Sequence, residues 1–136
     1  RKHPEIGAHI IGKHESPLLS TARQMALTHH ERWDGKGYPQ GLSADAIPLV
    51  GRIVAIADAY EAMTATQRHR APFHPHKAER QIIDGSGSQF DPELVNAFKN
   101  VAKDFEKIKR TFTDELEGIH DLDFTQRSAF KVGNKA

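Results

Sequence analysis

Two adjacent histidines and one aspartate are the residues of this chain whose types and spacing could carry metal chemistry. His29 and His30 end a predicted helix, and Asp58 lies in the apolar run IVAIADAY. A carboxylate on a buried helix face must be paired or bind a cation, because its isolated burial is costly or shifts its pKa. We therefore expect Asp58 to be buried, and either to bind a metal ion or to form a salt bridge with Arg52 or a distant histidine.

The histidine pair leaves several interpretations open. Neighbouring helix residues point about 100° apart, so the two rings are not expected to chelate one ion in the simplest way. They could serve two neighbouring ions, or one ring could bind metal while the other meets a substrate. A helix end with one surface histidine is the plain alternative. The chain has no cysteine, and imidazole with carboxylate suits metals such as Fe, Mn or Zn.

A glycine-rich loop follows the histidine pair. The stretch WDGKGYPQG, residues 33–41, holds three glycines and a proline, which cannot sustain a helix or a central strand. Its glycines allow close approach of the backbone to a ligand. Lys36 and Tyr38 could meet a phosphate by charge and hydrogen bonding. An ordinary surface turn is the alternative interpretation of this loop.

The elements that must position these residues are all predicted to be helices. Hydrophobic periodicity predicts helices at about 4–13, 18–31, 47–63 and 76–83, and a long one from 92 to about 118. The helix at 47–63 is apolar around most of its circumference, which is typical of a helix that is central in its domain. No strand or internal repeat is evident, so the predicted fold class is all-α. A loose tail is expected from about residue 119 to 136.

The long helix carries an apolar seam with alternating spacings of four and three residues. The seam consists of Leu94, Phe98, Val101, Phe105, Ile108 and Phe112. Such a pattern is heptad-like. Core packing is favoured over a homodimer formed through the seam, because short seams are marginal alone.

The composition excludes several classes of protein. The chain is 38% hydrophobic and 27% charged, with a net charge of +1, which gives no broad attraction to a nucleic acid polymer or an acidic membrane. No run of about 18 apolar residues predicts a membrane span, and no signal peptide is evident, so a cytoplasmic location is expected. The sequence begins with Arg1 and reads as a piece of something longer.

Several motifs in order resemble the signature of the HD-GYP domain family. HHERWDGKGYPQGL at residues 29–42 resembles the family's HHE…DGxGYPxGL pattern. HPEIG at 3–7 is similar to the family's HPExG segment. IP at 47–48 and RIVAIAD at 52–58 are similar to its IP…RI…AD segment. SGSQFDP at 86–92 is similar to its SGTxFDP segment. The resemblance runs from about Lys2 to about Phe98.

The resemblance implies a fold, an activity and a site. The fold is an HD-domain-like helical bundle, present here in part over residues 1–102, with 103–136 as a helical extension and tail. The activity is hydrolysis of cyclic di-GMP to linear pGpG, GMP or both in bacterial signalling. Two or three divalent ions, Fe or Mn, would be bound. A regulatory domain is expected upstream of this chain in the full protein.

Site residues follow from the same resemblance. The family's metal-ligand positions are matched by His3, His29, His30 and Asp58. Substrate contacts are expected from Tyr38, Lys36, Arg68 and Arg70. No side chain is assigned as the nucleophile; a metal-bound hydroxide is expected to attack phosphorus in line.

The chain departs from the family pattern in places. The His-Asp pair that names the superfamily is expected upstream of Arg1, and the similar-looking HIIGK at 9–13 is rejected because Ile10 cannot ligate a metal. Gln67 stands where an arginine that binds phosphate is usual, although Arg68 could substitute, and Glu61 replaces a usual aspartate. Two alternatives therefore stay open: a degenerate module that binds nucleotide or a partner protein without turnover, and a hydrolase of another nucleotide, which the GYP loop disfavours.

Overall fold

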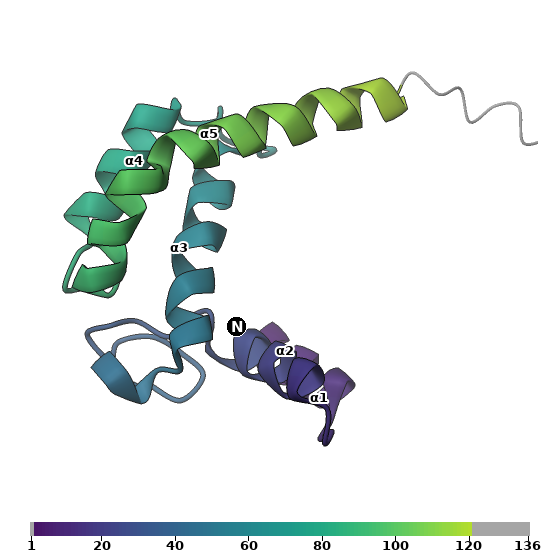
Figure 1. Ribbon diagram of the computed structural model, residues 1–136, viewed down its shortest axis with the longest axis vertical. Helices are drawn as coiled ribbons and strands as arrows, with labels where there is room; N and C mark the ends of the chain where they lie inside the picture. Colours follow the sequence, from purple (N-terminus) through teal and green to yellow (C-terminus); the bar gives the residue numbers. More distant parts are fainter. Residues whose placement is uncertain (1, 121–136) are drawn as a thin grey trace, which may run out of the picture. The chain divides into compact units, whose positions relative to one another are not determined.

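The chain folds into helices joined by ordered loops (Figure 1). The computed structural model describes residues 2–120, with side chains as far as residue 112. The elements in chain order are α1 (His3–Ile11), α2 (Pro17–Thr28), the 3-10 helix η1 (Ala44–Ala46), α3 (Leu49–Thr64), α4 (Pro75–Asp84) and α5 (Pro92–His120). Within residues 2–120, β-structure is limited to isolated bridges. The all-α prediction is confirmed.

Prolines set where several helices begin. Helices α1, α2 and α4 each carry a proline in the first turn, where the missing N–H costs nothing and the fixed φ suits the helix. The histidine segment differs from the prediction, because α2 ends at Thr28 rather than near Glu31. The 3-10 helix η1 was not predicted. It begins at Ala44, whose φ of 48° is unusual for a residue with a side chain.

Each helix packs on the next through residue 84. Helix α1 packs on α2, α2 on α3, and α3 on α4. Gly51 permits the close crossing of α2 and α3, since a Cβ there would lie 2.1 Å from the hydroxyl oxygen of Thr28. Helix α3 also contacts α5, where the rings of Tyr60 and Phe98 meet edge to face with centroids 6.1 Å apart. Helix α3 therefore connects the histidine-bearing helices to those that follow.

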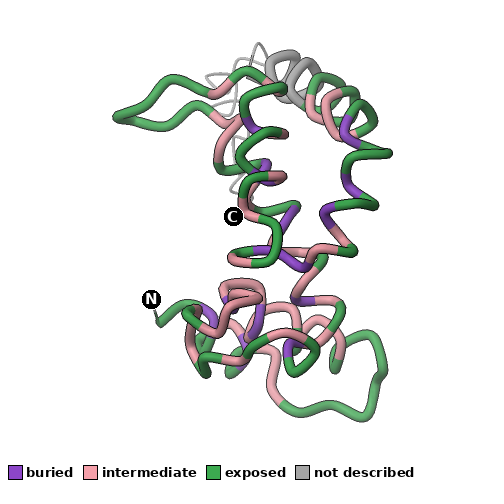
Figure 2. The backbone as a smooth tube through the Cα atoms, turned by 90° about the vertical axis from the view of Figure 1, so that its left-hand side faces the viewer, coloured by how far each residue is buried: buried purple, intermediate pink, exposed green. Residues whose placement is uncertain are grey.

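Only one face of α3 is buried, although its sequence is apolar nearly all round. Gly51, Ile56 and Tyr60 are buried, whereas Leu49 and Ile53 are 53% and 48% exposed. Figure 2 shows the same pattern along the backbone, with short buried stretches alternating with exposed ones. Helix α3 is central as predicted, because it contacts α2, α4 and α5, but these helices cover only part of its circumference.

The chain divides into two compact units, Arg1–Ala102 and Lys103–Ala136. In the first unit α5 buries Val95, Phe98 and Ala102. Further along the predicted seam, Val101, Ile108 and Phe112 are 40%, 54% and 58% exposed. Core packing is therefore confirmed for Phe98 and wrong for Val101 in the first unit, and for the seam beyond Ala102 both core packing and a homodimer stay predictions.

The part of the predicted loose tail from residue 121 onward lies outside the described residues. In the part of the chain that the structure describes, no helix has both the length and the apolar character needed to cross a membrane.

Candidate metal centre and adjoining cavities

Three imidazoles converge at the junction of α1 and α2. His3 begins α1, His29 caps the end of α2, and His30 follows it. One ring nitrogen from each lies within 4.8 Å of the others, and the Nε2 atoms of His3 and His30 are 2.9 Å apart. His29 and His30 do not point apart as neighbouring helix residues would. Helix α2 ends at Thr28, so His30 leaves the helical path, and the centroids of the two rings lie 4.1 Å apart.

The protonation of the His29 ring is set by the end of α2. Its Nδ1 lies 3.0 Å from the carbonyl oxygen of Met25 and 2.9 Å from that of Ala26. A carbonyl oxygen can only accept, so Nδ1 carries the proton and donates it. The lone pair of Nε2 is then left for a metal ion. Metal-binding histidines commonly donate their second ring N–H to a backbone carbonyl in this way.

The surroundings of His30 favour its neutral form, which is the form that binds metals. Burial lowers the pKa of His30 below its ordinary value, and repulsion from the neighbouring His29 and His3 lowers it further. The carboxylate of Asp58 acts in the opposite direction and raises this pKa. Because a metal ion competes with a proton for the ring nitrogen, a lowered pKa favours metal binding near neutral pH.

Asp58 lines the same cavity of about 300 Å³ as His29 and His30. Asp58 is exposed to solvent, so the expectation of a buried carboxylate is wrong. The cause is the open face of α3, on which Asp58 follows the exposed Ala57. The cavity is lined by His29, His30, Glu31, Arg32, Tyr38, Ala55, Asp58, Ala59, Ala62 and Gln89. Imidazole nitrogens and a carboxylate oxygen are a donor set that Fe, Mn and Zn accept, so these residues fit a divalent metal.

Tyr38 forms one wall of this cavity. Its ring stacks on that of His30, with centroids 5.0 Å apart and planes 23° apart, and its backbone N–H donates to the carbonyl of His30. The preceding Gly37 makes this return possible, since a Cβ at Gly37 would lie 2.4 Å from the backbone nitrogen of Arg32. The peptide bond between Tyr38 and Pro39 is cis. The loop thus folds back onto the histidine pair.

Glu31 organises the loop, a role that the sequence analysis missed. Its side chain is 3% exposed, and its two carboxylate oxygens accept from the backbone N–H groups of Gln40 and Leu42, at 2.7 and 3.0 Å. A buried carboxylate needs such donors. An acidic residue directly before a glycine-rich loop was the available signal, because such a loop offers backbone N–H groups that no secondary structure uses.

A second set of contacts joins this loop to the segment before α5. The backbone N–H groups of Trp33 and Asp34 donate to the carbonyls of Gln89 and Ser88, at 3.2 and 2.8 Å. Segments that are distant in sequence therefore form adjoining walls of the cavity. Residues 86–92 entered the prediction only as a family motif, and no contact with the glycine-rich loop was predicted for them.

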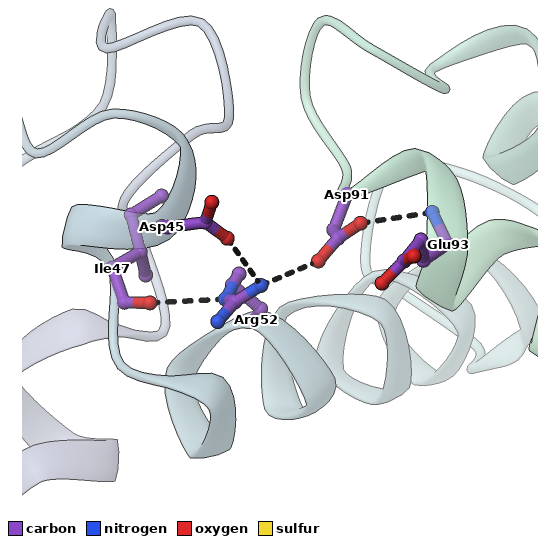
Figure 3. Close-up of polar contacts among 5 residues, drawn as sticks. All are labelled: Asp45, Ile47, Arg52, Asp91 and Glu93. Carbon is purple, nitrogen blue, oxygen red and sulfur yellow. Dashed lines mark hydrogen bonds and ion pairs between the residues drawn. The ribbon is translucent and has the colours of Figure 1, made fainter.

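Arg52 on α3 and Asp91 directly before α5 fix the same region (Figure 3). Nη1 of Arg52 lies 2.7 Å from Oδ2 of Asp91 and 3.3 Å from Oδ1 of Asp45, and its Nε donates to the carbonyl of Ile47. The other carboxylate oxygen of Asp91 accepts from the backbone N–H of Glu93, at 2.8 Å. Asp91 therefore caps α5 and pairs with Arg52, so the acidic partners of Arg52 among the described residues are Asp91 and Asp45 rather than Asp58.

The basic residues expected to contact substrate lie in different places. Arg70 lines a second cavity of about 270 Å³, together with Gln67, Gln81 and Gln89. Lys36 and Arg68 are exposed and line neither this cavity nor the one beside the histidines. Their contacts with substrate, like the metal ligation by the histidines and Asp58, stay predictions.

Comparison with known proteins gives this geometry a family. Residues 1–94 match the family model of the HD domain. The chain is 43% identical over 119 residues to a cyclic di-GMP phosphodiesterase of Vibrio cholerae, covering 84% of this chain and 24% of that protein. It is 35% identical over 114 residues to a 3′3′-cGAMP-specific phosphodiesterase of the same species, covering 84% of this chain and 22% of that protein. The chain thus spans about a quarter of the length of the curated relatives it matches.

A solved structure agrees with the helical arrangement. The crystal structure of a cyclic GMP-AMP specific phosphodiesterase of V. cholerae superposes with a TM-score of 0.53 at 25% sequence identity, covering 74% of this chain and 21% of that chain. Metal ions are implied by the family and supported by the histidine cluster. On the family match and these relatives, the chain belongs to the HD domain family and is of the HD-GYP type related to cyclic di-GMP phosphodiesterases.

Proposed function

We propose that the protein containing this chain is a metal-dependent phosphodiesterase that hydrolyses cyclic di-GMP. The observation that carries the proposal is the convergence of His3, His29 and His30 beside a cavity that Asp58 and Tyr38 line. Relatives named as phosphodiesterases of cyclic di-GMP or of 3′3′-cGAMP support the class of substrate. The choice of cyclic di-GMP rests on the greater identity to the first of these relatives.

The histidines and Asp58 would hold the divalent ions, two or three of Fe or Mn. When bound, such ions lower the pKa of coordinated water and polarise a phosphoryl oxygen. The end of α2 prepares His29 by fixing its proton on Nδ1, and the neutral ring of His30 needs no deprotonation before it binds. Asp58 adds the negative charge that offsets part of the charge of the ions.

Other residues of the cavity would place the substrate. Tyr38, stacked on His30, stands where a phosphate or ribose bound at the metal site would meet its ring. Arg70 in the adjoining cavity, with Lys36 and Arg68 nearer the surface, would offset negative charge on the phosphates. Water adds across one phosphorus–oxygen bond, so that one product end carries phosphate and the other a ribose hydroxyl. Repetition at the second bond would give GMP.

We also propose which further domain, location and oligomeric state belong to the full protein. The curated relatives are about four times as long as the aligned segment, so we propose that a regulatory domain accompanies this one in the full protein. We also retain the cytoplasmic location and bacterial signalling role expected from the sequence. A homodimer formed through α5 remains part of this proposal.

The test is cyclic di-GMP turnover by the full-length protein after loading with Mn or Fe. His29→Ala and Asp58→Ala should each lower kcat/KM by at least about 100-fold, since even second-shell changes at metal sites cost about 10–100-fold. Metal content measured by mass spectrometry should fall in the same variants. His9→Ala, an exposed histidine of α1 outside the cluster, is the matched control and should change neither quantity.

One observation favours a second candidate function, a module that binds nucleotide without turnover. The amide nitrogen of Gln67 donates to the carbonyl of Ala62 at 2.9 Å, at a position where the family resemblance leads one to expect an arginine. Binding of cyclic di-GMP by the metal-loaded protein with no product formed would favour this second function over the first.

A further inference from the structure

The cavity next to the metal site has the composition of a base-reading pocket. It lies between α3, α4 and the connector at residues 65–74, and it shares Ala59, Ala62 and Gln89 with the cavity beside the histidines. Three shared lining residues make the two cavities adjacent. A ligand bound at the metal site can therefore extend into the second cavity without leaving the protein surface.

The size of this second cavity suits part of a cyclic dinucleotide. Its volume of about 270 Å³ falls just below the range of about 300–1,000 Å³ that is usual for whole drug-sized ligands. Its apolar lining consists of Ala59, Ala62, Met63 and the 4% exposed Phe90. Apolar side chains of this kind suit the face of a purine ring, while Arg70 at the same cavity suits a phosphate.

The polar groups in the cavity are of the kind that read the edge of a base. The side-chain amides of Gln81 and Gln89 make no hydrogen bond among the side chains of residues 2–112. Each offers one acceptor and two donors. Glutamine amides pair with the edge of adenine, so the two amides can distinguish adenine from guanine, while Arg70 keeps the role toward phosphate proposed above.

The backbone holds these groups in place before any ligand binds. The N–H of Gln89 donates to the carbonyl of Gly85, and its carbonyl accepts from Trp33. Gln81 lies on α4. Gln67 and Arg70 exchange two backbone hydrogen bonds of 3.3 Å across a tight turn, and Nη2 of Arg70 donates to the carbonyl of Ala62 at 2.7 Å. The guanidinium also lies 4.6 Å from the ring centroid of Phe73, so Arg70 is oriented from two sides.

From these contacts we infer that this cavity holds one nucleobase of a cyclic dinucleotide, and that the amides of Gln81 and Gln89 determine which purine is preferred. The inference rests on the proposed function, because it takes the phosphodiester to lie at the histidine cluster. It goes further by naming residues that separate a substrate with two guanines from one with a guanine and an adenine.

The test compares cyclic di-GMP with 3′3′-cGAMP on the full-length, metal-loaded protein. Dissociation constants by calorimetry and kcat/KM are measured for both ligands. Gln81→Ala and Gln89→Ala should each change the ratio of the two dissociation constants by about tenfold, the discrimination that a lost edge contact gives. Gln24→Ala, an exposed glutamine of α2 outside both cavities, is the matched control and should leave the ratio unchanged.

Arg70→Gln separates base reading from simple attraction to phosphate. A phosphate contact would weaken both ligands equally, whereas a base contact in this cavity shifts the ratio toward the adenine-containing ligand. Unchanged ratios in Gln81→Ala and Gln89→Ala, or failure of the protein to bind either ligand, would overturn the inference. Binding with a shifted ratio but no hydrolysis would uphold the inference and refute the proposed phosphodiesterase activity.

Discussion

Replacement of Asp91 by alanine is expected to be among the most destabilising single changes in this chain. The carboxylate has two functions. It pairs with Arg52 at 2.7 Å, and it accepts the backbone N–H of Glu93 at the start of α5. Its side chain is 3% exposed and that of Arg52 is 16% exposed, so water cannot fully replace the lost contacts.

The magnitude follows from these two functions. Loss of one partner of a buried ion pair costs about 3–5 kcal/mol. We take the lower value, because Arg52 keeps Asp45 at 3.3 Å and some access to water. Loss of a helix cap adds about 1 kcal/mol. The sum of about 4 kcal/mol is a large fraction of a domain stability of about 5–15 kcal/mol.

Asp91→Asn separates the loss of the ion pair with Arg52 from the loss of the cap of α5. The amide keeps an oxygen that can cap α5 but loses the charge that pairs with Arg52, so the expected cost is about 3 kcal/mol. Asp45→Ala is the control, since Asp45 is 89% exposed and an exposed pair contributes about 0–1 kcal/mol. Urea denaturation followed by circular dichroism gives the free energy of unfolding, and unchanged slopes would validate the comparison.

A comparison of Asp91→Ala with Asp45→Ala can refute this reasoning. If Asp91→Ala lowers the free energy of unfolding no more than Asp45→Ala does, the buried pair does not hold α3 to the start of α5. The loop at residues 85–91 would then owe its place to its other contacts.

Further predictions concern helix packing, titration and metal content. Gly51→Ala should cost about 1–3 kcal/mol through overpacking against Thr28, measured by the same denaturation, and a neutral result would contradict the close crossing. The hydrogen bond from Arg32 lowers the pKa of Asp34 to about 2. Because folding lowers this pKa, the pair stabilises the fold fully above the unfolded-state pKa of about 3.9. That stabilisation is lost as the pH falls through about 2. Carboxyl NMR titration should therefore show a midpoint near 2, and Arg32→Ala should return it to the ordinary value. Removal of metal with a chelator should abolish hydrolysis, and added Mn or Fe should restore it.

Local sequence patterns were enough to predict the helices. Apolar periodicity acts within one element, and it placed each α-helix to within a few residues. The proximity of His29 and His30 to Asp58 followed from family motifs rather than from periodicity. The short helix η1 could not be predicted from the sequence. It begins at Ala44, which has a positive φ, and no glycine at that position indicates such a backbone conformation.

The errors arose where burial depends on neighbours rather than on the residue itself. The apolar stretch around Asp58 suggested an enclosed carboxylate, but a strip of α3 that includes Ile53 stays in contact with solvent. The same applies to Val101 on α5. Conversely, Glu31 was given no role at the end of its predicted helix and is buried, because the loop that follows it wraps round its carboxylate.

The backbone hydrogen bond from Trp33 to Gln89 gives the protein an optical reporter. Trp33 is the only tryptophan in the chain, and it lies where the loop after α2 meets the segment before α5. Its fluorescence therefore senses whether these two segments are joined, while far-ultraviolet circular dichroism senses the helices. Coincident unfolding curves would mean that the cavity walls and the helices form one cooperative unit. An earlier change in fluorescence would mean that the walls can separate while the helices stay folded.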